Sequence, residues 1–261
     1  MCDYESITRN IRVLSDLHLE HYTILPNFED MITSNKNDIL CLLGDIGNPF
    51  QESYKLFLEW CHNNFGIVLL ITGNHEYYGN SIESTNTQIE KICRNIGIIF
   101  LNNTTYIYKN IAFIGTTLWS YIPEHLSEQI SNYMNDYHLI QNFTIEINNK
   151  YFLENINFLE KSISYFKNNN FKVVILSHHT PLINSGTSYP PLEEKFQNCA
   201  FSSDLSYLVK QVDLWMYGHT HYNNNNNLIW KNNIPLVSNQ RGYASKLIKN
   251  YNKDFLITIN Y

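Results

Sequence analysis

The chain has 261 residues, of which 44% are hydrophobic and 16% are charged, a composition typical of a soluble globular protein that forms one large domain over residues 1–261. Its formal net charge of −6 argues against the broad basic surface with which proteins grip nucleic acid, so we expect no nucleic-acid partner. No apolar stretch approaches the ~20 residues that span a bilayer, which excludes a transmembrane helix and predicts no membrane association. An acidic chain can still hold phosphate through metal ions.

Scattered apolar runs predict the elements of the fold. In chain order, we expect a strand at 11–15, a strand at 39–43, a helix at 53–63, a strand at 67–72, a helix at 81–95, a strand at 111–115, a helix at 151–166, a strand at 173–177, a short helix at 204–210, a strand at 214–217 and further strands at 228–230, 234–238 and 255–259. The runs before residue 218 are β-branched and do not alternate, which indicates strands covered on both faces. Strands that alternate with helices indicate an α/β layered domain.

Two regions break this alternation. Residues 121–150 are polar and aromatic and carry no recognisable motif, so we predict a lid or an insertion that shapes a substrate site. Residues 223–227 are five asparagines, which we interpret as a flexible surface loop.

Cysteine usage and the N-terminal sequence bear on the compartment. The five cysteines are odd in number and without a CxxC pair, which predicts reduced thiols rather than a disulfide framework: Cys2, Cys41, Cys61, Cys93 and Cys199. Asp3 and Glu5 precede any apolar run, so the N-terminus does not look like a signal peptide. We therefore expect a cytoplasmic protein.

Polar side chains follow five of the predicted strands at the point where each ends. They are Asp16-Leu17-His18, Gly44-Asp45, Gly73-Asn74-His75-Glu76, His178-His179 and Gly218-His219-Thr220-His221. Ligands of open α/β sheets collect at the carboxyl ends of strands, so these groups should share one rim. Carboxylates suit hard divalent ions, and imidazoles suit Zn, Fe, Co, Ni or Mn. The pattern predicts a metal centre in which Asp45, with two carboxylate oxygens, could bridge two ions.

The order DxH…GD…GNH(E)…H…GHxH, over about residues 11–221, resembles the calcineurin-like metallophosphoesterase superfamily. The resemblance implies a four-layer α/β/β/α sandwich with two divalent metal ions. It implies one ion on Asp16, His18 and His221, a second ion on Asn74, His178 and His219, and Asp45 between them. His178 is chosen over His179 because it directly follows a strand.

Four residues are expected to meet the substrate. The resemblance implies that His75 is the catalytic residue, which contacts the phosphate and assists the leaving group, and that Asn74 also touches the substrate. His179 either lines the substrate pocket or packs in the core. Glu76 is expected to orient an imidazole. Arg241 either contacts phosphate or pairs with a surface carboxylate.

The C-terminal stretch Ser238-Asn239-Gln240-Arg241-Gly242-Tyr243 resembles an Asn-Pro-Arg-Gly-Tyr motif found in one branch of the superfamily. Gln240 stands where that motif has proline. The stretches at 177–181 and 201–205 also resemble this branch.

The expected function is hydrolysis of a small phosphomonoester or phosphodiester by a hydroxide that bridges two divalent ions. A nuclease or a protein phosphatase on the same fold is an alternative, although the chain lacks the arginine-rich phosphate clamp of such phosphatases. The other alternative is a non-catalytic metal-binding scaffold. Mn, Fe, Zn, Co and Ni all remain open as the metal, as does the oligomeric state.

Overall fold

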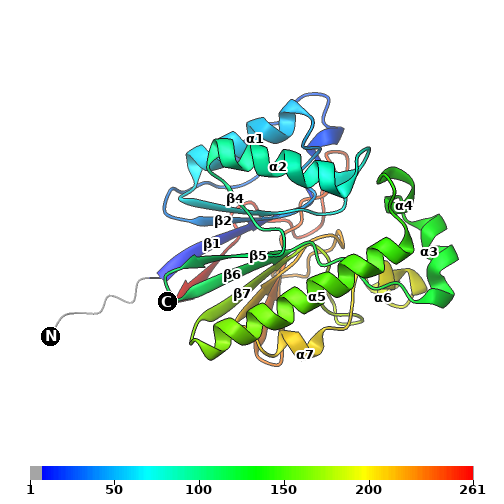
Figure 1. Ribbon diagram of the computed structural model, residues 1–261. Coiled ribbons are helices and arrows are strands. Elements are labelled where there is room, and N and C mark those ends of the chain that lie inside the picture. Colours follow the sequence, from blue (N-terminus) through cyan, green and yellow to red (C-terminus); the bar gives the residue numbers. More distant parts are fainter. Residues whose placement is uncertain (1–7, 261) are drawn as a thin grey trace.

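The computed structural model describes residues 8–260, so Cys2 and the acidic N-terminal residues considered above lie outside the described residues. Two sheets form the centre of the molecule (Figure 1). The first has the order β11-β1-β2-β3-β4, with β1 at Thr8–Leu14, β2 at Ile39–Leu43, β3 at Ile67–Ile71, β4 at Ile99–Phe100 and β11 at Leu256–Asn260. The second has the order β5-β6-β7-β8-β10-β9, with β5 at Thr104–Tyr108, β6 at Ile111–Thr116, β7 at Lys172–Ser177, β8 at Leu214–Met216, β9 at Leu228–Lys231 and β10 at Ile234–Val237.

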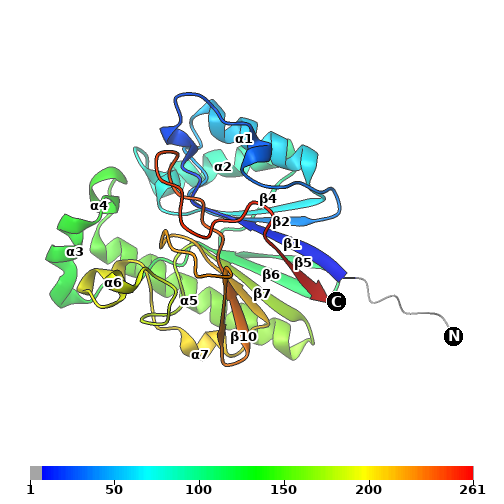
Figure 2. The ribbon, with the colours of Figure 1, turned by 180° about the vertical axis from the view of Figure 1, so that it is seen from behind.

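Most neighbouring strands are parallel. In the first sheet, β1 to β4 run parallel and β11 is antiparallel to β1. In the second sheet, β6, β7, β8 and β10 run parallel, while β5 and β9 are antiparallel at the edges. The chain crosses back to the first sheet after β10 (Figure 2). The carboxyl ends of β1, β2, β3, β7 and β8 are therefore free to carry loops toward one rim.

The layers follow from alternating side chains. In β2, Ile39, Cys41 and Leu43 belong to the apolar cluster that joins the two sheets, whereas Leu40 and Leu42 belong to the cluster beneath the helices. Strand side chains point alternately to opposite faces, so a fully apolar strand serves two cores at once.

Helices cover the outer face of each sheet (Figure 1). The first sheet carries α1 at Glu52–Asn64 and α2 at Ile82–Ile96, and the second carries α5 at Ile145–Asn168 and α7 at Ser206–Val209. This confirms the expected α/β/β/α sandwich. The remaining helices are α3 at Ser127–Tyr133, α4 at Asp136–Leu139 and α6 at Pro190–Glu193, with 3-10 turns at Leu19–His21, Phe28–Asp30, His75–Tyr77, Glu124–Leu126 and Phe196–Ala200. No helix within residues 8–260 has the length and apolar character needed to cross a membrane.

The segment at 121–150 is largely helical. It contains α3, α4 and the first turns of α5, which begins at Ile145 because the Thr144 side chain accepts a hydrogen bond from the Ile147 N–H. Sequence periodicity predicts a start at residue 151, which is six residues too late. The short strands β4 and β5 were also not predicted.

The asparagine run is not the flexible surface loop that its composition suggested. Asn223 and Asn227 are buried. The Asn227 side chain donates to Asn239 Oδ1 at 2.7 Å, and Asn224 Nδ2 donates to the carbonyl of Leu228 at 2.7 Å. Asparagine side chains can satisfy backbone and side-chain partners locally, so the run forms a hydrogen-bonded turn before β9.

Candidate metal centre

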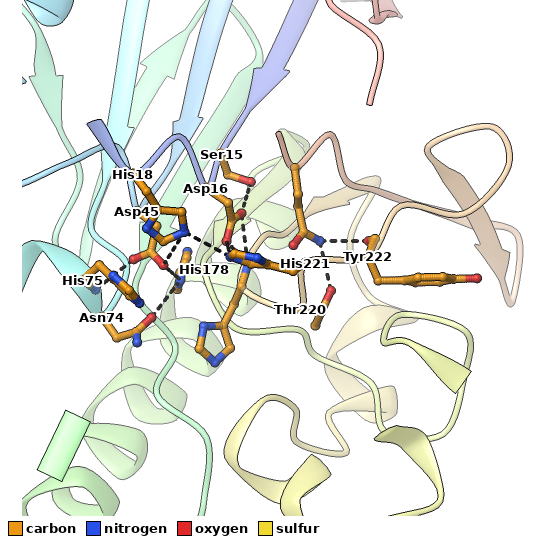
Figure 3. Close-up of polar contacts among 12 residues, drawn as sticks. Ser15, Asp16, His18, Asp45, Asn74, His75, His178, Thr220, His221 and Tyr222 are labelled. Carbon is orange, nitrogen blue, oxygen red and sulfur yellow. Dashed lines mark hydrogen bonds and ion pairs between the residues drawn. The ribbon is translucent and has the colours of Figure 1, made fainter. Parts of the chain in front are cut away.

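The loops that follow the strands meet between the two sheets. Ser15 and Gln240 form an isolated parallel bridge that joins the end of β1 to the end of β10. The Asp16 N–H donates to the carbonyl of Gly44 at 3.1 Å, and the Gly218 N–H donates to the carbonyl of His178 at 2.9 Å. The predicted ligands thus leave the two sheets from loops that are fastened to each other, and their side chains converge (Figure 3).

Asp16, His18 and His221 form the first ligand group. Their ligand atoms all lie within 4.8 Å of one another. The Nε2 atoms of His18 and His221 are 3.0 Å apart, and His221 Nε2 lies 3.4 Å from Asp16 Oδ1. Ligand atoms about 2.0–2.2 Å from one ion lie about 3–3.5 Å from each other, so these separations fit a shared metal.

The second ligand group contains Asp45, His178 and His219, again within 4.8 Å. Asn74 Oδ1 joins it at 3.2 Å from His178 Nε2. The Nε2 atom of His219 is buried without a hydrogen-bond partner. Burial lowers the pKa of His219 well below its usual range, with a further contribution from His179, which leaves a neutral ring with a lone pair for an ion.

Asp45 lies between the two groups. Its Oδ2 is 3.4 Å from His178 Nε2 and 3.8 Å from His18 Nε2, so one carboxylate oxygen faces an imidazole of each group. Burial opposes ionisation of Asp45, but the charges of His178 and His75 hold its pKa well below the usual range. The seven residues predicted as ligands therefore gather at one place, and their donor types fit two divalent ions.

The backbone at this site is strained. Five of the seven predicted ligands have a left-handed φ: Asp16 (56°), His18 (50°), Asp45 (53°), His219 (70°) and His221 (47°). Residues other than glycine rarely adopt this conformation, and it persists only where the surroundings enforce it. The loops accept this strain at the positions whose side chains point inward.

Glu76 is one of the groups that enforce the loop shapes. Its buried carboxylate accepts from the N–H groups of Asp45 at 2.9 Å, Ile46 at 2.7 Å and Gly73 at 2.7 Å. The expectation that Glu76 orients an imidazole is therefore wrong, because these bonds are all to the main chain. The second imidazole nitrogens are held elsewhere: His178 Nδ1 lies 2.7 Å from the carbonyl of Leu43.

Glu20 is a member of the site that sequence reasoning missed. Its Oε1 lies 3.2 Å from His18 Nδ1 and 3.3 Å from His75 Nδ1. Burial opposes ionisation of Glu20, but these two contacts lower its pKa to about 2. The only signal was its position two residues after His18, where the 3-10 turn at Leu19–His21 folds it back.

His75 lies at the edge of the centre with 15% of its side chain exposed. Its ring packs against Tyr78 at a centroid distance of 4.3 Å and against His18 at 4.4 Å. Burial disfavours a charged ring, but Asp45 and Glu20 raise the pKa of His75 to about 9. With Nδ1 beside Glu20, Nε2 is the nitrogen left to meet a substrate.

The other two predicted substrate residues occupy different positions. The His179 ring is buried and stacks on His219 at 4.0 Å, with Nδ1 2.8 Å from the Ser120 hydroxyl. Arg241 donates from Nη1 to the Tyr22 hydroxyl. The structure thus places His179 against a ligand and Arg241 against an aromatic side chain.

Gln240, at the position where the C-terminal motif has proline, acts on the first ligand group. Its side-chain amide is buried and donates to Thr220 Oγ1 at 3.0 Å and to the carbonyl of Tyr222 at 3.0 Å. These two partners flank His221. Tyr243, three residues later, stacks on the His18 ring at 4.2 Å.

A cavity of about 270 Å³ opens over both ligand groups. Its walls are Asp45, Asn74, His75, Tyr78, Tyr133, Met134, Asn135, Phe201, His219, Thr220, His221 and Tyr243. A larger cavity, of about 780 Å³, shares Tyr133, Thr220, His221 and Tyr243 with it. Lys195, Lys246 and Lys249 line this larger cavity.

Comparison with known proteins finds similarity over most of the chain. A family model described as calcineurin-like phosphoesterase matches residues 9–223. The uncharacterized protein L509 of Acanthamoeba polyphaga mimivirus is 36% identical over 263 residues, which cover 90% of this chain and 92% of the relative.

Two solved structures share the fold at low sequence identity. Phosphopantetheinyl hydrolase (PptH) of Mycobacterium tuberculosis has a TM-score of 0.75 and 14% identity, covering 96% of this chain and 95% of that one. TT1561 of Thermus thermophilus has a TM-score of 0.55 and 12% identity, covering 97% of this chain and 99% of that one.

Proposed function

Because the chain belongs to the calcineurin-like phosphoesterase family, we propose that it is a binuclear metal-dependent hydrolase of a small phosphate ester. The observation that carries this proposal is the pair of ligand groups, each within 4.8 Å, with Asp45 Oδ2 facing an imidazole of both. Asp16, His18 and His221 would hold one ion, and Asn74, His178 and His219 the other, with Asp45 bridging them.

Bound divalent ions, drawn from Mn, Fe, Zn, Co or Ni, would acidify a shared water so that it attacks phosphorus, and would neutralise the phosphate oxygens. The remaining work falls to the chain itself. His75 would donate a proton from Nε2 to the leaving oxygen while Glu20 holds Nδ1. Protonated His75 is favoured by the same carboxylates that raise its pKa.

The cavities suggest how a substrate would lie. The phosphate would occupy the small cavity over the ligands, where Asn74 and His75 form part of the wall. The rest of the ester would extend past His221 and Tyr243 into the larger cavity. His179 would support this arrangement from behind His219. For Arg241 to contact the phosphate, its bond to Tyr22 would have to open.

A cytoplasmic location remains part of the proposal. The four cysteines within residues 8–260 are free thiols, which suits a reducing compartment.

The test is metal-dependent hydrolysis by the purified protein. Metal is stripped and Mn²⁺ restored, and nitrophenolate release is followed from p-nitrophenyl phosphate and bis-p-nitrophenyl phosphate. We expect turnover that requires metal and is lost in Asp45→Asn, and the preferred ester would separate monoesterase from diesterase. Single-stranded DNA and a phosphopeptide, run beside them, test for a nuclease or a protein phosphatase. If the protein hydrolyses none of these substrates with Mn²⁺, Zn²⁺, Co²⁺ or Ni²⁺, the catalytic proposal fails and a non-catalytic metal-binding scaffold becomes the favoured function.

A further inference from the structure

Asp136 reaches the second ligand group from outside the sheets. It is the first residue of α4, lies between α3 and α5 in the chain, and is only 3% exposed. Its Oδ1 accepts hydrogen bonds from Asn74 Nδ2 at 2.7 Å and from the Tyr78 hydroxyl at 2.6 Å. Burying a carboxylate is costly unless it is hydrogen-bonded, and both hydrogen bonds of Asp136 go to side chains beside the second ligand group.

The contact selects one orientation of the Asn74 carboxamide. A carboxamide has an oxygen that accepts and an amide nitrogen that donates, and the two ends exchange when the group turns by half a rotation. Asp136 Oδ1 accepts a hydrogen bond from the Asn74 amide nitrogen, so the Asn74 carboxamide oxygen must point away from Asp136. That oxygen lies 3.2 Å from His178 Nε2, within the second ligand group. A metal ion needs the oxygen in that position, since the amide nitrogen is not a ligand.

The surrounding backbone holds Asp136 in place. The Gly79 N–H donates to the carbonyl of Leu139 at 2.8 Å, and the Gln141 N–H donates to the carbonyl of Asn80 at 3.0 Å. The Gln141 side chain adds a bond of 2.7 Å to the carbonyl of Gly79. The end of α4 is therefore fastened to the loop that begins at Asn74. Residues 133–135, just before Asp136, form part of the cavity wall over both groups.

We propose that Asp136 is a positioning residue that completes the second metal site by turning the Asn74 carboxamide oxygen toward the ion. Residues 133–141 must then be docked on the loop at 74–80 for the second ion to bind with full affinity. This inference rests on the proposed binuclear function. Asn74 and Tyr78 both donate to Oδ1 of Asp136. An asparagine at position 136 keeps a neutral oxygen acceptor there, so it should hold the Asn74 carboxamide in the same orientation.

Metal binding by the full-length protein tests the inference without relying on activity. Metal-free protein is dialysed against graded Mn²⁺, and bound metal is counted by elemental analysis. We expect wild type to bind two ions. In Asp136→Ala we expect the first ion to bind as in wild type and the second to bind about 10–100-fold more weakly. Asp136→Asn, which keeps Oδ1, should restore most of the affinity for the second ion.

Asp38→Ala is the matched control. Asp38 is also a buried aspartate, and it accepts from Arg12 Nε at 2.8 Å and from Asn10 Nδ2 at 3.3 Å, away from the ligands. Thermal melts of both alanine variants report general destabilisation. We expect Asp38→Ala to lower the melting temperature and leave the ratio of the two metal affinities unchanged. If Asp136→Ala does not fold, Asp136→Glu replaces it in the experiment. The longer side chain displaces the carboxylate, so we expect the same loss of affinity for the second ion.

The outcomes separate the two proposals. If Asp136→Ala or Asp136→Glu binds both ions as wild type does, the role of Asp136 is overturned and the binuclear function stands. Equal weakening of both ions would also overturn it, because the effect would not be specific to Asn74. If wild type binds no second ion, the binuclear function fails, and the role of Asp136 fails with it.

Discussion

The two ligand groups are held by different parts of the chain. The first group depends on loops that join strands: the Ser15 hydroxyl donates to Asp16 Oδ2, and Gln240 holds the loop around His221. The second group depends in addition on Asp136, which belongs to a helical segment outside both sheets. The residues that hold the first group therefore lie in loops that follow strands. The second site also requires the segment at 133–141 to dock. Different substitutions should therefore weaken the binding of the first ion and of the second ion.

Asp45→Asn should have the largest effect, because it removes the charge shared by both groups. We expect kcat/KM for bis-p-nitrophenyl phosphate to fall by about 10³-fold, or about 4 kcal/mol. Initial rates at saturating Mn²⁺ measure this loss. Asp204→Asn, a surface change whose carboxylate caps only the Ser206 N–H, serves as the control. A rate for Asp45→Asn close to that of the control would remove Asp45 from the centre.

His75→Ala should come next, and its effect should depend on the leaving group. We expect a loss of about 10²-fold in kcat for an alkyl phosphate ester, since an alkoxide needs a proton to depart. Nitrophenolate is a good leaving group and should depart with a much smaller penalty. The measurement compares kcat for the two esters, and equal losses for both would argue against proton donation by His75.

Gln240→Ala should weaken metal binding by the first ligand group selectively. Removing the amide frees the loop on both sides of His221, so we expect the first ion to bind about 10-fold more weakly while the second is little changed. Metal counting by dialysis reports both affinities, with Gln211→Ala on the surface as control. Asp136→Ala should have the opposite effect, because it should weaken the second ion and leave the first unchanged. Loss of the second ion in place of the first would contradict the assignment of His221 to the first group.

Glu20→Gln should have the smallest effect and change the pH dependence. The charge of Glu20 raises the pKa of His75, so its removal should lower that pKa. His75 donates only while protonated, and activity is lost as pH rises through its pKa. The alkaline limb of kcat should therefore move to lower pH in Glu20→Gln. A profile of kcat across roughly pH 6 to 10, which brackets the ordinary and the raised pKa of His75, checks the direction. An unmoved or upward-shifted limb would break the link between Glu20 and His75.

The site residues that lie directly after a predicted strand could be predicted from the sequence. Asp45, Asn74 and His178 each stand within three residues of the end of a buried strand, so their place at one rim follows from the order of strands. The layered α/β class follows from the alternation of strands and helices, whereas the four-layer sandwich was implied by the resemblance to the superfamily.

The supporting residues could not be predicted, because their partners are distant in sequence. Asp136 meets a side chain 62 residues earlier, and Gln240 meets one 20 residues earlier. No local pattern marks either contact. Glu76 was placed at the site by its motif, but its role depends on three N–H groups that only the folded loops bring together.

The most direct test is a titration of metal-free protein with Mn²⁺, in which bound ions per chain and the rate of bis-p-nitrophenyl phosphate hydrolysis are measured on the same samples. We predict that the rate stays near zero until the first ion is bound and rises in proportion to the second. Hydrolysis that persists without metal, or that reaches its maximum with one ion per chain, would contradict a reaction carried by a binuclear centre.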